Sequence, residues 1–100
     1  MATDTKLEER VVTSLKPPKL WKVIFLNDDQ TTMELVIVLL TSIFKHSVQE
    51  AKSITLEIHD TGSGVAGTYP YEIAEQKVIE ATSIARQNGS PLKIHLEEAE

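Results

Sequence analysis

The sequence predicts a single small α+β domain in which three helices pack on one face of a three-stranded sheet. Two observations lead to this fold class. Strand-like and helix-like segments follow one another in the order β-α-α-β-α-β, and three short strands provide too little sheet for a doubly wound α/β core. The chain has 100 residues, a length typical of one hydrophobic core. We therefore expect one folded domain over residues 19–100, preceded by a flexible N-terminal extension over residues 1–18.

The extension is expected to end at Pro17 and Pro18. Two consecutive prolines have fixed φ angles and no N–H donor, which suits an extended spacer better than a helix interior. The extension also has a weak amphipathic pattern, made by four apolar residues: Leu7, Val11, Val12 and Leu15. Such a segment would order on a partner surface rather than alone.

The first strand is predicted over residues 20–26 (LWKVIFL), which are mostly apolar, β-branched or aromatic. The turn formers Asn27, Asp28 and Asp29 end it. A helix should follow, because Thr31 as N-cap and Glu34 three residues later fit a capping box. Its apolar face is predicted at helical spacing and comprises Met33, Val36, Ile37, Leu40, Ile43 and Phe44.

The second helix is predicted to begin with another capping box, made by Ser47 and Glu50. Gly62 supplies a left-handed residue that would stop this helix. Its apolar residues recur at helical spacing: Val48, Ala51, Ile54 and Ile58. A short strand over residues 64–69 (GVAGTY) follows.

The third helix should start with Pro70 in its first turn and end at Asn88 and Gly89. Its apolar line is predicted to be Ile73, Ala74, Val78, Ala81, Ile84 and Ala85. Residues 92–96 (LKIHL) alternate strictly between apolar and polar side chains, which predicts a half-buried last strand.

Composition excludes several classes of function. The net charge is −5, which repels nucleic acid and anionic lipid. No apolar run approaches the roughly 20 residues of a membrane helix, and the first ten residues lack a signal-peptide pattern. Because the chain has no cysteine, disulfides, thiolate metal sites and cysteine nucleophiles are absent. We expect a cytoplasmic protein that binds neither nucleic acid nor membrane.

The densest polar cluster is Asn27-Asp28-Asp29, between the first strand and the first helix. In one interpretation it makes an Asx-turn and places carboxylates near a helix N-terminus. In the other, its oxygens face a cleft and accept hydrogen bonds from a cationic ligand. Consecutive oxygen donors lack the spacing of a calcium loop, so no metal is expected.

The three histidines do not form a metal-ligand pair. His59 falls in the last turn of the second helix, where it would at least complement the helix dipole. His46, beside a turn, and His95, on the last strand, are both expected to be solvated. The string Gly62-x-Gly64-x-x-Gly67 follows a helix and spans a strand, so it does not predict a dinucleotide site.

Residues 22–36 (KVIFLNDDQTTMELV) resemble the signature of the ClpS family, which reads close to KVxxxNDDxTPMEFV. Further segments resemble later parts of the family in the same order: residues 51–59 (AKSITLEIH), 64–67 (GVAG), 71–77 (YEIAEQK) and 91–92 (PL). The resemblance covers roughly residues 18–97. It implies that residues 19–100 form a ClpS-like adaptor domain, without enzyme activity or cofactor.

By this resemblance, the protein would be a monomeric adaptor that binds proteins with a free N-terminal Leu, Phe, Tyr or Trp. It would deliver them to the AAA+ unfoldase of the Clp protease, through the N-terminal domain of ClpA or ClpC. Residues 1–18 match the extension that engages the unfoldase during delivery. Glu72 and Lys77 match positions that contact its N-terminal domain.

The resemblance also implies a binding site. The substrate α-amine would be bound by Asn27, Asp28 and His59, while Asp29 and Thr31 shape the same corner. The apolar pocket for the first side chain would be lined by Met33, Val36, Thr55, Ile58 and Leu92.

The sequence departs from the family pattern at Thr55, where Met is frequent. A shorter and partly polar residue would widen or wet the pocket. Met33 is retained and would crowd out β-branched side chains, so Leu and Phe should be accepted and Val bound poorly.

Two alternatives stay open at this point. The order of elements is similar to that of the C-terminal domain of the ribosomal stalk protein, a protein-interaction domain without such a pocket. A small metal-dependent hydrolase using Asp28, Asp29 and His59 would lose activity to chelators.

Overall fold

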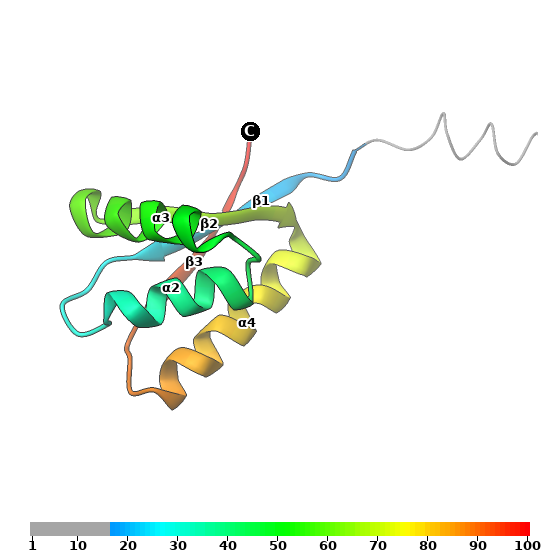
Figure 1. Cartoon of the computed structure of the whole chain (residues 1–100). Helices are drawn as coiled ribbons and strands as arrows, with labels where there is room; N and C mark the ends of the chain where they lie inside the picture. Colours follow the sequence, from blue (N-terminus) through cyan, green and yellow to red (C-terminus); the bar gives the residue numbers. More distant parts are fainter. Residues whose placement is uncertain (1–16) are drawn as a thin grey trace, which may run out of the picture.

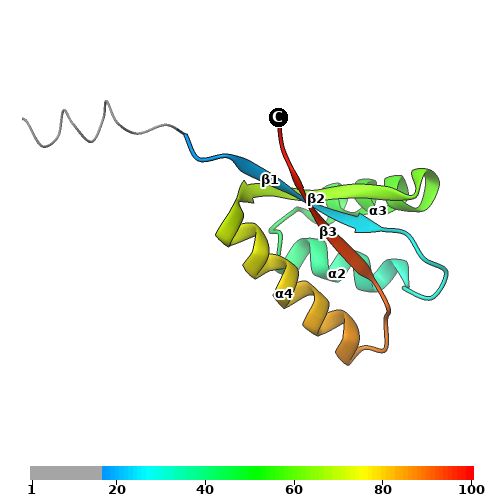
Figure 2. The same ribbon diagram turned by 180° about the vertical axis from the view of Figure 1, so that it is seen from behind.

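The central sheet has three antiparallel strands in the order β2-β1-β3, with β1 (Leu20–Leu26) between β2 (Ser63–Pro70) and β3 (Lys93–Glu98). The computed structural model describes residues 17–100, so most of the expected extension over residues 1–18 lies outside the described residues. All three described helices lie on one side of the sheet (Figures 1 and 2). The predicted fold class and order of elements are confirmed.

Strand β1 is central because it pairs with β2 on one side and with β3 on the other, and its side chains alternate in burial. Val23 and Phe25 are fully buried under the helices, while Ile24 and Leu26 are half-buried on the opposite face. The pairing of β1 with β2 shifts between Val23 and Ile24, so that Ala66 has no partner in the register. A bulge of this kind increases the local strand twist.

Helix α2 (Met33–Ser42) begins one residue later than predicted, because its N-cap is Thr32 and not Thr31. The Thr32 hydroxyl accepts a hydrogen bond from the Leu35 amide at 3.1 Å. The Thr31 hydroxyl instead donates to the Asp28 carboxylate at 2.7 Å, which draws Thr31 into the preceding loop. Two adjacent threonines offer the same capping group, and only the loop contact distinguishes them.

Helix α3 (Val48–Thr61) has the predicted ends. Ser47 caps its N-terminus by accepting from the Glu50 amide at 3.1 Å. Gly62, with φ of 99°, caps its C-terminus in the left-handed conformation. The last turn of α3 is held beside the end of β1, where the backbone amide of Asn27 donates to the Gly62 carbonyl at 2.9 Å.

Helix α4 (Tyr71–Gln87) begins after Pro70, which is the last residue of β2 and the N-cap of the helix rather than part of its first turn. The predicted apolar line is only partly buried. Ala74, Ala81 and Ala85 are inaccessible to solvent, whereas Ile73 is 50% exposed. Small alanines allow α4 to lie close to the sheet, so the longer Ile73 side chain at the helix edge remains outside the core.

The last strand begins one residue later than predicted, because Leu92 lies in the loop before β3. Leu92 is nevertheless 1% exposed, so this loop carries one of the most buried side chains of the domain. His95 is exposed as expected. His46 is not fully solvated: its Nε2 atom hydrogen-bonds the Ala66 carbonyl at 2.6 Å, and the side chain is half-buried.

The core lies between the sheet and the helices and includes an edge-to-face contact between Phe25 and Phe44, with ring centroids 5.5 Å apart. Phe44 and Ile43 are buried as predicted, although α2 ends before them. Lys45, with φ of 63°, turns the chain after them toward α3.

Gly64 allows β2 to pass directly under α3. A Cβ atom at this position would lie 2.7 Å from Cγ1 of Ile58. We therefore expect Gly64→Ala to lower the free energy of unfolding by about 1–3 kcal/mol, the usual cost of overpacking a core. Urea denaturation would measure the change. Val65→Ala, at the exposed neighbour in the same strand, is the control, and equal stability of the two variants would contradict the close contact.

Candidate functional site

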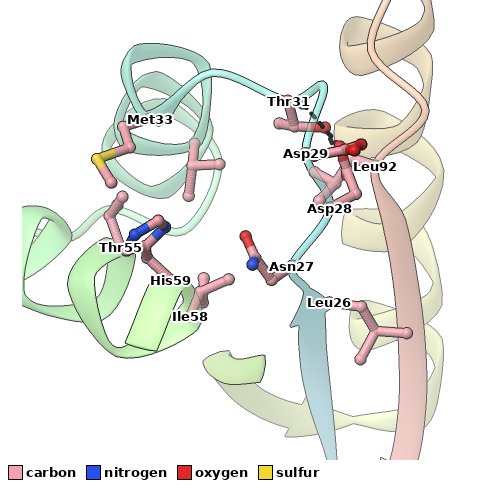
Figure 3. A pocket seen from close by; sticks show the side chains of 11 residues that line it. Leu26, Asn27, Asp28, Asp29, Thr31, Met33, Thr55, Ile58, His59 and Leu92 are labelled. Carbon is pink, nitrogen blue, oxygen red and sulfur yellow. Dashed lines mark hydrogen bonds between the residues drawn. The ribbon is translucent and has the colours of Figure 1, made fainter. Parts of the chain in front are cut away.

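A cavity of about 340 Å³ opens where the end of β1, the start of α2 and the last turns of α3 meet. The loop before β3 contributes to its wall. Figure 3 shows the lining side chains, which are Leu26, Asn27, Asp28, Asp29, Thr31, Met33, Val36, Thr55, Ile58, His59 and Leu92. The structure thus brings together ten residues that were predicted as the binding site, although they are spread over 66 positions of sequence from Asn27 to Leu92.

Asp28 organises the loop between β1 and α2. Its Oδ1 atom accepts hydrogen bonds from the amides of Gln30 and Thr31, both at 2.7 Å, and Oδ2 accepts from the Thr31 hydroxyl at 2.7 Å. The Asx-turn interpretation of the polar cluster therefore holds for Asp28. A carboxylate has about four acceptor positions, so roughly one remains free for a ligand.

The pKa of Asp28 is lowered from its ordinary value. Partial burial opposes ionisation, but the hydrogen bonds from Thr31 and Gln30 and the positive charge of Arg86 outweigh it. The carboxylate is consequently charged at neutral pH and supplies the negative potential of this corner of the cavity.

The low pKa of Asp28 predicts a loss of stability in acid. A carboxyl group with a lower pKa in the folded state contributes stability above its unfolded pKa of about 3.9, and that contribution disappears as the pH falls through the folded pKa. The Thr31→Val variant lacks the hydroxyl that donates to Asp28. Between pH 6 and pH 2.5, the free energy of unfolding of this variant should therefore fall less than that of the wild type. Urea titrations across this range would measure both, and parallel curves would contradict the contribution of this bond.

The loop before β3 is tied to the Asp28 loop by a second set of hydrogen bonds. The hydroxyls of Thr31 and Ser90 lie 2.6 Å apart, and the Leu92 amide donates to Ser90 Oγ at 3.1 Å. Arg86 donates through Nη1 to the carbonyls of Ser90 and Leu92, both at 2.9 Å. These contacts hold Leu92 against the cavity.

Helix α3 supplies three cavity residues from one face, because Thr55, Ile58 and His59 are spaced i, i+3 and i+4. His59 is exposed in the last turn. Figure 3 shows the Asn27 side chain extending from the end of β1 toward the side of the cavity formed by His59 and Thr55. No hydrogen bond joins Asn27 or His59 to another residue of the cavity wall (Figure 3). Their polar atoms can therefore bind a ligand.

The apolar part of the cavity is formed by Val36, Ile58 and Leu92, which are all less than 9% exposed, and by Met33, which is 40% exposed. Met33 thus borders the opening rather than the core. Thr55 is buried, and its hydroxyl donates to the Ala51 carbonyl at 2.7 Å. The Thr55 hydroxyl thus already has a hydrogen-bond partner in its own helix, and the effect of Thr55 on the width and wetness of the pocket stays a prediction.

Leu26 is a cavity residue that the sequence analysis did not single out. Its side chain points away from the Asn27 side of the cavity in Figure 3. Leu26 is the last residue of β1 and was interpreted only as a strand residue, and no motif distinguishes it from its neighbours.

The other two predicted contact residues, Glu72 and Lys77, lie on α4 and do not line the cavity. Glu72 is exposed in the first turn. The Lys77 ammonium donates to the Ile43 carbonyl at 2.9 Å and lies 5.3 Å from the centre of the Tyr69 ring. Lys77 also borders a second groove beside the end of α2, so part of its side chain packs internally while the remainder faces that groove.

The cavity therefore combines an apolar floor with a rim of carboxylate, amide and imidazole groups. Residues 17–100 include no group of three or more His, Cys, Asp or Glu side chains placed to hold a metal ion. Within the same residues, no helix has the length and apolar character needed to cross a membrane. The arrangement suits a small organic ligand with one cationic end and one apolar end.

Comparison with known proteins gives consistent matches to one family, two curated relatives and one solved structure. Residues 16–95 match the family described as ATP-dependent Clp protease adaptor protein ClpS. Two curated relatives carry the name ATP-dependent Clp protease adapter protein ClpS. The one from Shewanella loihica is 47% identical and the one from Shewanella pealeana 48%, each over 93% of this chain and 91% of the relative.

A solved structure is also similar. It is that of Agrobacterium tumefaciens ClpS2 bound to L-phenylalaninamide, which aligns with a TM-score of 0.79 at 37% identity. The alignment covers 83% of this chain and all of the solved chain.

Proposed function

The chain belongs to the ClpS family of adaptors of the ATP-dependent Clp protease, and from this premise we propose that its cavity binds the free N-terminal residue of substrate proteins. The proposal is based on one observation: the same cavity has both an oxygen-lined rim and an apolar floor. An N-terminal residue has the matching chemistry, because it places an α-ammonium group next to its first side chain.

The solved ClpS2 structure supports the same class of ligand. L-phenylalaninamide has a free α-amine, an aromatic side chain and an amide where the next residue of a peptide would begin. It therefore resembles the first residue of a polypeptide chain. We propose that the cavity of the present protein accepts N-terminal Leu, Phe, Tyr and Trp.

The α-amine is proposed to bind at Asn27, Asp28 and His59. A free ammonium offers three charged donors, and an amide oxygen, a carboxylate oxygen and an unprotonated imidazole nitrogen can each accept one. Asp29 and Thr31 shape this corner, Thr31 through its hydrogen bond to Asp28. An acylated amine has lost the charge and two of the donors, so the site would distinguish a chain start from an internal residue.

The first side chain is proposed to enter between Met33, Val36, Thr55, Ile58 and Leu92. Burial of a Leu-sized side chain is worth about 1.5–3 kcal/mol, and each charge-assisted hydrogen bond about 1.5–3 kcal/mol. After the cost of association these terms give roughly micromolar binding. Such modest affinity suits an adaptor that must release its cargo.

The partner is proposed to be the N-terminal domain of ClpA or ClpC, which Glu72 and Lys77 on α4 would contact. Residues 1–18 would engage the unfoldase during delivery. These assignments rest on the family resemblance, on the exposure of Glu72 and on the second groove beside Lys77. We also propose a cytoplasmic location, on the basis of the family match alone. The match to the ClpS family favours this function over the alternative of a ribosomal-stalk-like interaction domain.

Fluorescence polarisation with labelled peptides tests the proposal. A Leu-initiated peptide should bind with roughly micromolar affinity, and N-acetylation of the same peptide should weaken binding at least about 100-fold, because the charged hydrogen bonds are lost. A Met-initiated peptide is a further control, and a Val-initiated peptide should bind poorly beside Met33. Equal affinity for the free and the acetylated Leu peptides would overturn the proposed function.

A further inference from the structure

Ser90 connects the two halves of the cavity without lining it. It lies in the loop between α4 and β3, is 4% exposed and does not belong to the cavity wall. Its hydroxyl nevertheless contacts two residues that do line the cavity, Thr31 at 2.6 Å and the amide of Leu92 at 3.1 Å. Thr31 belongs to the polar rim and Leu92 to the apolar floor.

The directions of these hydrogen bonds follow from counting hydrogens. The single hydroxyl hydrogen of Thr31 is donated to Oδ2 of Asp28. In the bond between Thr31 and Ser90 the donor must therefore be Ser90. Ser90 then has no hydrogen left and accepts from the Leu92 amide. The result is one directed chain from Leu92 through Ser90 and Thr31 to the Asp28 carboxylate.

The backbone around Ser90 is held independently of its hydroxyl. Arg86 donates to the carbonyls of Ser90 and Leu92, and the Ser90 amide donates to the Ala85 carbonyl at 2.9 Å. Removal of the hydroxyl should thus leave the loop in place and break only the chain of hydrogen bonds. The Leu92 amide would then lose its partner, and Thr31 would lose the donor that orients it toward Asp28.

We propose that Ser90 is a positioning residue of the binding site, one that sets the distance between the polar rim and the apolar floor through Thr31 and Leu92. The proposal rests on the proposed function, because the rim and the floor matter together only for a ligand that contacts both. A free N-terminal residue is such a ligand, since its ammonium and its side chain branch from the same carbon atom.

A double-mutant cycle with a fluorescent Leu-initiated peptide tests this role. Ser90→Ala should weaken binding by about three- to tenfold, the effect of one lost neutral hydrogen bond. Thr31→Val removes the next link and should weaken it at least as much. The double variant should bind no more weakly than Thr31→Val alone, because both changes break one chain.

Ser47→Ala is the matched control, because it removes the N-cap of α3 and lowers stability without touching the chain. It should keep wild-type affinity. If Ser90→Ala binds within twofold of the wild type, or if its effect adds in full to that of Thr31→Val, the positioning role is overturned.

A second measurement needs no ligand. Carbon-13 NMR titration of the Asp28 carboxyl should give a higher pKa in Ser90→Ala than in the wild type, because Thr31 is no longer held against the carboxylate. The charge of Arg86, which also lowers the Asp28 pKa, is present in both proteins. A wild-type protein that binds no peptide would overturn the proposed function. An unmoved Asp28 pKa would overturn the directed chain itself.

Discussion

Replacement of His59 by alanine is expected to weaken binding of a Leu-initiated peptide by about 10- to 100-fold, the loss of one charge-assisted hydrogen bond. His59 is exposed in the last turn of α3 and makes no hydrogen bond within the cavity wall. The substitution should therefore leave the thermal unfolding temperature nearly unchanged. Fluorescence polarisation gives the affinity, and circular dichroism on heating gives the stability.

His95→Ala is the matched control for this experiment. His95 is also exposed, but it lies on β3 and outside the cavity. It should bind the peptide as the wild type does. If His59→Ala binds as tightly as His95→Ala, His59 has no role in reading the α-amine and the assigned rim is incorrect.

Asp28→Ala is a less direct test of the same rim than His59→Ala. Asp28 accepts three hydrogen bonds from its own loop, so its removal frees the Gln30 and Thr31 amides and loosens the start of α2. Weaker binding by this variant could come from the loss of a ligand contact or from the loss of loop structure, and the affinity alone does not separate the two causes. The His59 substitution separates these effects because its side chain holds no part of the fold.

The sequence predicted the elements of the fold well because their signals are local. Ser47 and Gly62 specify the ends of α3 by their own capping chemistry. The start of α2 was misplaced by one residue because Thr31 and Thr32 have equal capping ability. The choice between them is made by the Asp28 carboxylate and by Ser90, 59 residues away in sequence, and no local pattern contains that contact.

The site was predicted through family resemblance more than through residue chemistry. The Asn27-Asp28-Asp29 cluster is visible in the sequence, but its pairing with His59 depends on how α3 packs beside the end of β1. Contacts that support the site were invisible. Arg86 is in the last turn of α4 and Ser90 follows this helix, and no motif distinguishes either residue. Leu92 was named as a pocket residue through the resemblance, but it was expected in a strand, whereas it lies in the loop before β3.

Thr55 lines the apolar part of the cavity. Its hydroxyl is bound to the Ala51 carbonyl of its own helix, which is the usual position for a buried Thr in a helix. The side chain therefore acts as a small apolar group. Because Thr55 on α3 and Met33 on α2 lie on the same side of the cavity (Figure 3), a longer side chain at position 55 would occupy space that the proposed ligand needs.

Thr55→Met is expected to weaken binding of a Trp-initiated peptide by about 5- to 100-fold, the equivalent of about 1–3 kcal/mol of overpacking. A Leu-initiated peptide, with its smaller side chain, should lose much less. Leu56→Met is the matched control, because Leu56 is 53% exposed on the same helix and does not line the cavity. Thr55→Ser keeps the bond to Ala51 and should retain binding of both peptides. A uniform loss for Trp and Leu peptides would mean that Thr55 supports the fold of the site and does not select the first side chain.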